Sequence, residues 1–217
     1  ARKIGENKFK KFIEQTRLLK TPDIQLEEVG IPIKFKWNKC KLETVSYGHG
    51  IATTPLQATA LYATLVNGGK IIKPNLIKGN TEESNGKLIS EETSLRINKI
   101  LRKVVTEDEG TAKLADVHGY NVGGKTGTSQ NYKNIKENLN TFISVFPSQK
   151  PKYVLLVMLE NPQVAEDLIY DYRGLKIKAS RNEAGWNSVY VSGKIIKKIG
   201  PILAIKDKDF NSQYVAE

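Results

Sequence analysis

The chain has 217 residues, of which 39% are hydrophobic and 26% charged, so it can bury the core of about one globular domain and is not expected to be disordered. Its formal net charge is +11, but only six of the 34 basic residues are arginines and the lysines are scattered. We therefore predict a solvated basic surface and no nucleic-acid partner, with long-range attraction to an anionic polymer or membrane as the alternative.

The first predicted element is a helix over residues 6–19, because Phe9, Phe12 and Ile13 fall at helical spacing with charged residues on the other side. Residues 21–41 contain two prolines and a glycine, which predict an irregular connection.

A second helix has a well-marked start. Thr54 can cap it, Pro55 suits the first helical position, and Gln57 can complete a capping box. Residues 67–69 (Asn-Gly-Gly) tolerate the left-handed conformation and predict the end of this helix. Residues 71–72, two isoleucines shortly before a proline, predict a short edge strand.

A polar loop is predicted over residues 79–89, and Ser90 is expected to cap the helix that follows it. Glu91 and Glu92 would lie in the positively polarised first turn of that helix. Its apolar stripe recurs at i, i+3, i+4, i+7 and i+8 and consists of Ile97, Ile100, Leu101, Val104 and Val105. A short helical turn is predicted over residues 110–115.

Three consecutive antiparallel strands are predicted over residues 121–130, 141–146 and 153–160, with the last strand buried on both faces. The apolar run in this last strand is far too short to cross a bilayer. Helices that precede a three-strand meander indicate an α+β fold rather than alternating βαβ units.

The remaining C-terminal segment divides into two parts. Residues 163–183 are charged and predict an irregular surface insertion. Residues 184–200 predict a last helix that ends before Pro201. The residues that this helix is expected to bury are Trp186, Val189, Tyr190, Gly193 and Ile196.

The most informative chemistry lies in residues 122–129, Val-Gly-Gly-Lys-Thr-Gly-Thr-Ser. Glycine inside a strand often marks the close approach of a ligand or another backbone, so Gly127 would let a substrate backbone lie against the strand. Lys125 supplies a cation, and Thr126 and Thr128 supply hydroxyls two residues apart. We expect the cation and both hydroxyls on one strand face to form a carboxylate site. The alternative is a glycine-rich turn with a solvated lysine.

Several blocks of the chain resemble class B penicillin-binding proteins, particularly the cell-division type. Residues 119–130 are similar to the region around the Lys-Thr-Gly motif of that family, and residues 44–57 are similar to its Gly-x-Gly…Thr-Pro-Leu-Gln segment. The smaller blocks that also fit are residues 66–69 with Pro74, residues 104–105 and residues 110–112. Because the blocks occur in the family's order, the chain 1–217 is identified as the C-terminal portion of one transpeptidase domain.

The resemblance implies a peptidoglycan D,D-transpeptidase that works by serine acyl transfer. A serine attacks the penultimate D-Ala carbonyl of a stem peptide, releases the terminal D-Ala and passes the acyl group to an amine of another stem; β-lactams imitate D-Ala-D-Ala. By this resemblance Lys125 and Thr128 are catalytic, and residues 125–128 (Lys125, Thr126, Gly127 and Thr128) bind substrate. Lys125 would hold the electrostatic network and the substrate carboxylate, the hydroxyls of Thr126 and Thr128 would bind that carboxylate, and the Thr128 N–H would be an oxyanion donor.

The chain departs from the family because it has no credible nucleophile. Residues 84–87 match Ser-x-x-Lys in letters, but Asn-Gly in the middle would break the helix that this motif needs. Residues 180–182 match Ser-x-Asn but follow the Lys-Thr-Gly strand instead of preceding it. We therefore expect this chain to hold one wall of the active site and to be inactive alone.

No cofactor or metal is expected. Cys40 is the single cysteine, which excludes an intrachain disulfide and a cysteine-based metal site. His49 and His118 are too isolated for a metal site or a triad, and Gly48-His49-Gly50 lacks the context of a nucleotide loop.

The resemblance also implies partners and a location. The expected ligands are peptidoglycan stem peptides ending in D-Ala-D-Ala and β-lactam antibiotics, and the expected partners are cell-wall synthesis or division proteins. The expected parent is anchored in the cytoplasmic membrane with its catalytic domain on the periplasmic side. No signal peptide is recognisable in this chain, so we expect the targeting sequence to lie outside it. The alternatives are a β-lactamase or β-lactam sensor, disfavoured by the Thr-Pro-Leu-Gln block, and a non-catalytic module that binds peptidoglycan or partner proteins.

Overall fold

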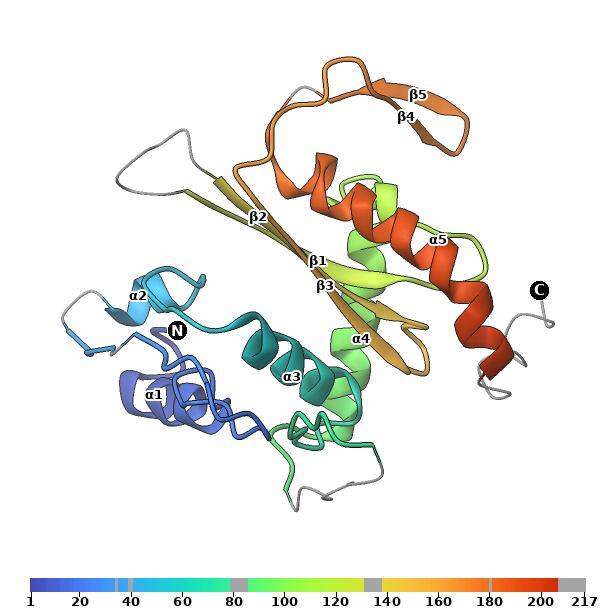
Figure 1. Ribbon diagram of the computed structural model, residues 1–217. Coiled ribbons are helices and arrows are strands. Elements are labelled where there is room, and N and C mark those ends of the chain that lie inside the picture. Colours follow the sequence, from blue (N-terminus) through green and yellow to red (C-terminus); the bar gives the residue numbers. More distant parts are fainter. Residues whose placement is uncertain (34, 39–40, 79–85, 131–137, 180, 207–217) are drawn as a thin grey trace. The chain divides into compact units, whose positions relative to one another are not determined.

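The computed structural model describes residues 1–33, 35–38, 41–78, 86–130, 138–179 and 181–206 (Figure 1). The chain divides into two compact units, residues 1–93 and residues 94–217, which are described separately. Helices, a three-stranded antiparallel sheet and a C-terminal helix confirm the α+β prediction.

The first unit begins with helix α1, Glu6–Gln15, which is four residues shorter than predicted. The helix stops because Arg17 has a left-handed φ of 60°, which a right-handed helix cannot continue. Its buried side is also narrow: Ile13 is buried, whereas Phe12 is 38% exposed. Helix α2, Lys41–Val45, is absent from the sequence predictions, because five residues are too few to show a helical period.

Helix α3, Pro55–Val66, begins as the sequence predicts. The Thr54 hydroxyl accepts a hydrogen bond from the Gln57 N–H (3.2 Å), and the Gln57 side-chain oxygen accepts one from the Thr54 N–H (3.1 Å), which confirms the capping box. The predicted edge strand over residues 71–72 is wrong. The Ile72 N–H donates instead to the Thr64 hydroxyl (2.9 Å), and the pairing found among the described residues is an isolated bridge between Lys70 and Lys87.

Helix α4 spans Glu91–Thr106, and the Ser90 hydroxyl caps it by accepting from the Thr93 N–H (3.2 Å). Its buried stripe differs from the predicted one. The residues buried at i, i+4, i+7 and i+11 are Ser94, Asn98, Leu101 and Val105. Ile100 is 60% exposed, so its predicted burial is wrong. The covered side of the helix includes the polar Ser94 and Asn98, which a hydrophobicity pattern ignores.

The second unit contains the three predicted strands in the order β1 (Gly123–Gln130), β2 (Asn138–Phe146) and β3 (Tyr153–Glu160), all antiparallel. The predicted sheet is therefore confirmed, and among the described residues β1 is an edge strand that carries Lys125 and Thr126. The prediction that β3 is buried on both faces is wrong, because β3 forms the opposite edge among the described residues and its Met158 is 41% exposed.

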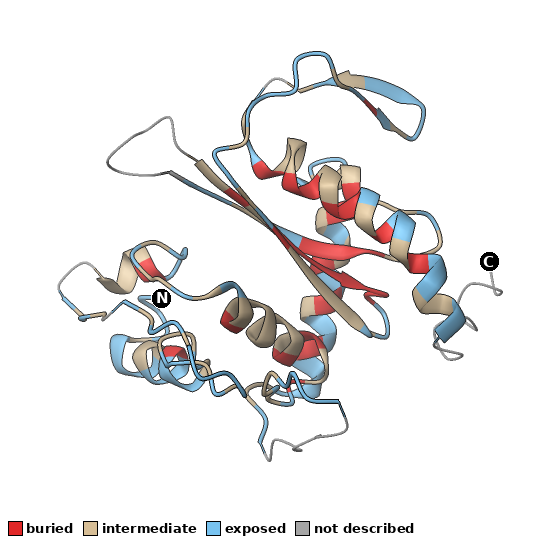
Figure 2. Cartoon of the chain, viewed as in Figure 1, coloured by how far each residue is buried: buried red, intermediate tan, exposed pale blue. Residues whose placement is uncertain are grey.

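One face of this sheet forms the core with the short helix η1 (Lys113–Ala115) and helix α5 (Ser188–Lys206), which lies along the sheet in Figure 1. The core residues are Val105, Ala112, Ala115, Val122, Phe142, Phe146, Val189 and Ile196. Figure 2 shows the buried positions concentrated on the sheet and on one side of α5. The predicted helix end before Pro201 is wrong, because Leu203 and Ala204 also pack against the core and hold the turn beyond the proline.

The predicted irregular insertion instead contains a hairpin of strands β4 (Ile169–Tyr172) and β5 (Leu175–Lys178). Arg173 and Gly174 join the strands with positive φ angles of 51° and 84°, as a tight hairpin turn requires. Tyr170 is buried and its hydroxyl donates to the Trp186 carbonyl (2.7 Å), just ahead of α5 in the short helix η2 (Ala184–Trp186). The insertion is thus anchored to the core by an aromatic residue.

Candidate functional site

Strand β1 carries all the predicted site residues on an edge of the sheet. In the register of the sheet, Thr126 lies opposite Phe142, Thr128 opposite Asn140, and Lys125 opposite Ile143. Successive side chains of a strand point to opposite faces, so both threonines share the core face and Lys125 lies on the other. The expectation that the cation and both hydroxyls share one face is therefore wrong for Lys125.

Two glycines of β1 lie close to the neighbouring strand β2. A Cβ on Gly124 would come within 2.4 Å of the Phe142 ring, and a Cβ on Gly127 within 2.5 Å of the Thr141 hydroxyl oxygen. The Thr141 hydroxyl also donates to the Gly127 carbonyl (3.2 Å). Close packing of β2 explains Gly124, because the Ile143 backbone oxygen would also lie within 2.6 Å of its Cβ. At Gly127 the close neighbour is a side-chain hydroxyl that can rotate, and the approach of a substrate backbone there stays a prediction.

The two threonine hydroxyls are held in defined positions. The hydroxyl oxygens of Thr126 and Thr111 are 3.0 Å apart, and the Thr128 hydroxyl accepts from the Ala184 N–H (3.2 Å). The Lys125 ammonium is exposed and donates to the Thr126 carbonyl (2.7 Å). Because the Thr128 oxygen is used as an acceptor, its proton is available to a ligand.

A cavity of about 320 Å³ lies beside these hydroxyls within the second unit. Thr126 and Thr128 line it from the sheet, Thr111 and Lys113 from the segment before β1, and Tyr172 from the hairpin. Burial raises the pKa of Tyr172, so its hydroxyl stays protonated at neutral pH. The sequence patterns do not reveal Lys113 and Tyr172 as lining residues, because their contribution depends on tertiary contacts that no local spacing encodes.

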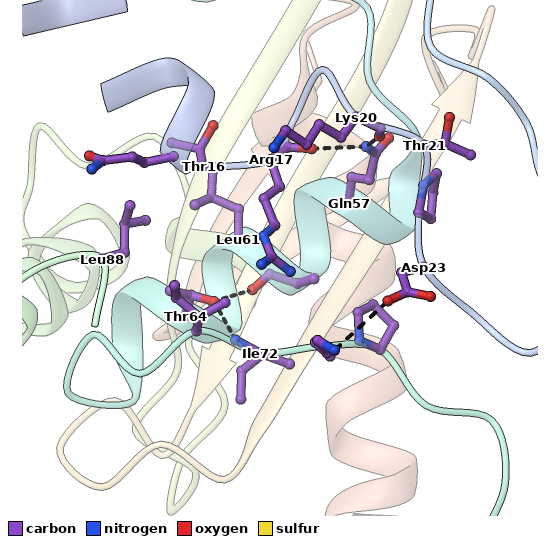
Figure 3. Close-up of a pocket in the computed structure, with 16 residues that line it drawn as sticks. Thr16, Arg17, Lys20, Thr21, Asp23, Gln57, Leu61, Thr64, Ile72 and Leu88 are labelled. Carbon is purple, nitrogen blue, oxygen red and sulfur yellow. Dashed lines mark hydrogen bonds and ion pairs between the residues drawn. The ribbon is translucent and has the colours of Figure 1, made fainter. Parts of the chain in front are cut away.

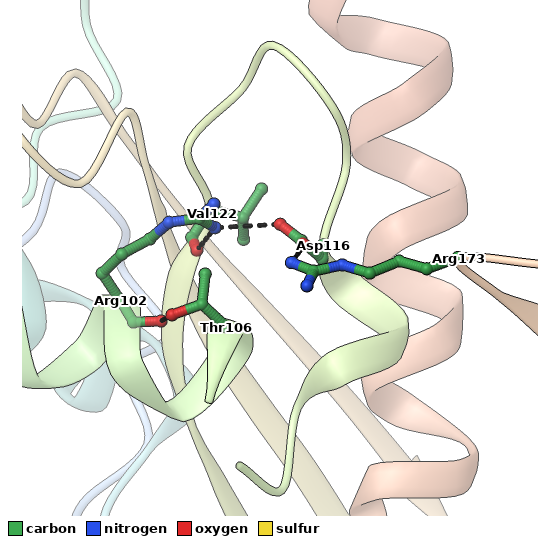
Figure 4. A network of polar contacts seen from close by, with 5 residues as sticks. All are labelled: Arg102, Thr106, Asp116, Val122 and Arg173. Carbon is green, nitrogen blue, oxygen red and sulfur yellow. Dashed lines mark hydrogen bonds and ion pairs between the residues drawn. The ribbon is translucent and has the colours of Figure 1, made fainter. Parts of the chain in front are cut away.

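The hairpin is tied to the start of β1 by a charge network (Figure 4). Asp116, whose side chain is only 13% exposed, accepts from Arg173 (2.7 Å) and from Arg102 (3.0 Å). Arg102 also donates to the Val122 carbonyl (2.7 Å), immediately before β1. One carboxylate therefore positions the hairpin turn relative to the strand that carries the site.

The first unit has a cavity of its own, of about 280 Å³, between the end of α1, helix α3 and residues 71–74 (Figure 3). The Gln57 amide reaches across it and donates to the Arg17 carbonyl (3.1 Å) and to the Lys20 carbonyl. Lys73 and Asp23 form an ion pair of 3.8 Å at its other side. None of the predicted site residues lies in this cavity.

The other sequence predictions fall outside these two cavities. In the ranges that the structure describes, no three histidine, cysteine, aspartate or glutamate side chains gather where a metal ion could bind. A helix long and apolar enough to cross a membrane is likewise missing from the described residues. Ser84 and Ser180, which begin the two rejected motifs, lie outside the described residues.

The comparisons with known proteins agree with this architecture. A family model described as "Penicillin binding protein transpeptidase domain" matches residues 1–182. The chain is 28% identical over 223 residues to "Probable peptidoglycan D,D-transpeptidase FtsI" of Caulobacter vibrioides, a match that covers 96% of this chain and 36% of that protein. It is 32% identical over 180 residues to Stage V sporulation protein D of Bacillus subtilis, covering 74% of this chain and 28% of that protein.

A solved structure shares the fold. The apo transpeptidase domain of penicillin-binding protein 3 from Burkholderia pseudomallei superposes with a TM-score of 0.73 at 20% identity, covering 90% of this chain and 57% of that chain. The chain thus spans about a third of the length of the curated relatives it matches, at 36% and 28%. The predicted resemblance to class B penicillin-binding proteins is confirmed, and the chain belongs to the family of penicillin-binding protein transpeptidase domains.

Proposed function

We propose that the full-length protein carrying this chain is a serine D,D-transpeptidase that cross-links peptidoglycan stem peptides and is acylated by β-lactams. Residues 1–217 form the C-terminal portion of its transpeptidase domain and carry one wall of the active site. The family match supports this assignment. The observation that carries it is the edge strand β1, whose Thr126 and Thr128 hydroxyls line a cavity in the second unit.

In this proposal the two faces of β1 have different tasks. Thr126 and Thr128 donate hydrogen bonds to the substrate carboxylate, and Lys125, exposed on the opposite face, supplies the cation of the network around the nucleophile. The Thr128 N–H donates to the oxyanion. The Thr126 carbonyl accepts from the Lys125 ammonium at the outer edge of β1. Residues two apart in a strand direct their backbone groups to the same side, which supports an orientation of the Thr128 N–H toward this edge.

The location and partners follow the same proposal. The parent is anchored in the cytoplasmic membrane with this domain on the periplasmic side, and it works with cell-wall synthesis or division proteins. The support is the resemblance to relatives whose names refer to peptidoglycan transpeptidation and sporulation. Fractionation of cells that express the tagged full-length protein tests the location: recovery in the soluble cytoplasmic fraction would contradict it.

The decisive experiment is covalent labelling of the full-length protein with a fluorescent penicillin, combined with detection of D-Ala released from a stem peptide. We expect stoichiometric labelling on a serine upstream of this chain and no labelling of residues 1–217 alone. Peptidoglycan binding without labelling or D-Ala release would instead favour the non-catalytic binding module. Hydrolysis and turnover of the penicillin without D-Ala release would favour a β-lactamase.

A further inference from the structure

A carboxylate in the cavity of the second unit needs a cation that β1 does not supply. The hydroxyls of Thr126 and Thr128 line this cavity, but Lys125 lies on the other face of the strand. Burying a carboxylate without a countercharge is costly, even when hydroxyls donate to it. Lys113 is the one basic residue among the described residues that line the cavity.

The backbone around Lys113 is tightly packed. It begins the short helix η1, which is packed so closely against α5 that a Cβ on Gly193 would come within 2.6 Å of the Leu114 carbonyl oxygen. Ala112 and Ala115, on either side, are fully buried. Side chains that extend from well-packed elements hold a ligand more precisely than side chains on loose loops.

The Lys113 ammonium is also available. Among the described residues, no carboxylate forms an ion pair with it. Glu183, the acidic residue that lines the cavity, lies 3.7 Å from Arg181. The Lys113 nitrogen lies over the ring of Tyr172, at 5.9 Å from the ring centroid. A cation beside an aromatic wall is partly desolvated, which strengthens its attraction to an incoming anion.

The hairpin completes this arrangement. Tyr172 and Ile177 line the cavity from β4 and β5, and Trp186 lines it from η2. The hydroxyl oxygen of Tyr172 is buried and has no hydrogen-bond partner among the described residues. The cavity thus presents hydroxyls, the Lys113 cation and an apolar, aromatic wall, while the one acidic residue among its described lining residues, Glu183, is paired with Arg181. This combination suits a carboxylate next to a small apolar group.

We propose that Lys113 is a substrate-binding residue, whose ammonium pairs with the carboxylate that Thr126 and Thr128 bind, and that the β4–β5 hairpin is the wall of this carboxylate site. The ligand class is a peptide with a free C-terminal carboxylate, or a β-lactam that carries the equivalent group. The inference rests on the proposed function. It adds a charged group and a wall that the Lys-Thr-Gly strand alone does not provide.

The test pairs a charge change in the protein with a charge change in the ligand. Second-order acylation rates of the full-length protein are measured with benzylpenicillin, which has a free carboxylate, and with its methyl ester, which has none. For Lys113→Met we expect a loss of about 10- to 100-fold with the acid, the size typical of a hydrogen bond to a charged group, and little change with the ester. Lys113→Arg should retain most of the rate, and Lys99→Met, at an exposed lysine of α4, should match wild type.

The outcomes separate the two proposals. If wild type is acylated and Lys113→Met reacts equally fast with the acid, or slows equally with acid and ester, the role of Lys113 is refuted while the transpeptidase assignment stands. If wild type reacts with neither probe, the proposed function fails and this inference with it.

A thermal melt of each variant identifies any rate loss that comes from unfolding. If Lys113→Met is unfolded, Lys113→Gln takes its place, because it removes the charge but keeps a polar, flexible side chain. A rate loss of Lys113→Gln that is confined to the acid supports the pairing, and equal losses with both probes refute it.

Discussion

The cavities of the two units have similar volumes, about 280 and 320 Å³, but their walls are built differently. In the first unit, a turn with a left-handed Arg17 is connected to helix α3 through the amide of Gln57. In the second unit, the lining residues extend from strands and short helices packed on a fully buried core. Side chains on such elements keep their geometry, so we expect changes in the second cavity to alter rates and changes in the first to alter stability.

The largest expected effect concerns Lys125 in the full-length protein. Lys125→Ala should slow penicillin acylation by about 10²- to 10³-fold, the size typical of losing one group that stabilises transition-state charge. Because Lys125 is exposed, the melting temperature should not change. Stopped-flow acylation and a thermal melt measure both quantities, with Lys197→Ala on the exposed side of α5 as the control. An unchanged acylation rate would make Lys125 an ordinary surface lysine.

The second expected effect is on folding. Gly124→Ala would place a methyl group 2.4 Å from the Phe142 ring and 2.6 Å from the Ile143 carbonyl oxygen. We expect a loss of about 3 kcal/mol in the free energy of unfolding, near the upper end for overpacking. Denaturant unfolding measures it, and Gly30→Ala is the control because its added Cβ meets nothing within 4 Å. Equal stability of the two variants would show that β1 can move away from β2.

The first cavity is tested by Gln57→Glu. The carboxylate can still accept from the Thr54 N–H, but it cannot donate to the carbonyls of Arg17 and Lys20. Two carbonyls lose their donor, so we expect a loss of about 1–2 kcal/mol in unfolding free energy. Gln163→Glu makes the same chemical change at an exposed position. If both variants melt alike, the amide of Gln57 does not hold the turn.

The smallest expected effect is that of Arg173→Ala, which removes the link between the hairpin turn and Asp116. Arg173 is exposed and Asp116 keeps its ion pair with Arg102, so the melting temperature should stay near that of wild type. Amide hydrogen exchange should nevertheless accelerate locally in β4 and β5. Lys176→Ala, which removes the pair with Asp171 inside the hairpin, is the matched control. Unchanged exchange in Arg173→Ala would show that Tyr170 alone anchors the hairpin.

Local signals in the sequence predict much of this fold. The cap at Thr54 is predictable because the capping box is completed within four residues, and the three strands are predictable because their apolar runs are separated by clear turns. The hairpin of β4 and β5 gives no such signal, because its strands are only four residues long and lie in a segment rich in charged residues, and a single buried residue, Tyr170, anchors it.

The site itself is predictable only in part. Residues 125–128 stand out in the sequence, but the alternation of side chains along a strand separates Lys125 from the two threonines, and the prediction of a shared face ignored it. Lys113 and Tyr172 cannot be found from spacing, since they lie 59 residues apart by number and reach one cavity only through η1 and the hairpin. Tertiary contacts, not local pattern, complete the site.

The hydrogen bond from the Ala184 N–H to the Thr128 hydroxyl has a consequence for mutational robustness. The donor belongs to the main chain, so it is present whichever residue occupies position 184, with the exception of proline. Substitutions that arise at this position therefore cannot delete the donor that orients the Thr128 proton, although they can crowd the buried site. The direction in which the Thr128 hydroxyl donates is therefore set by a main-chain group and not by a side chain that a mutation could remove.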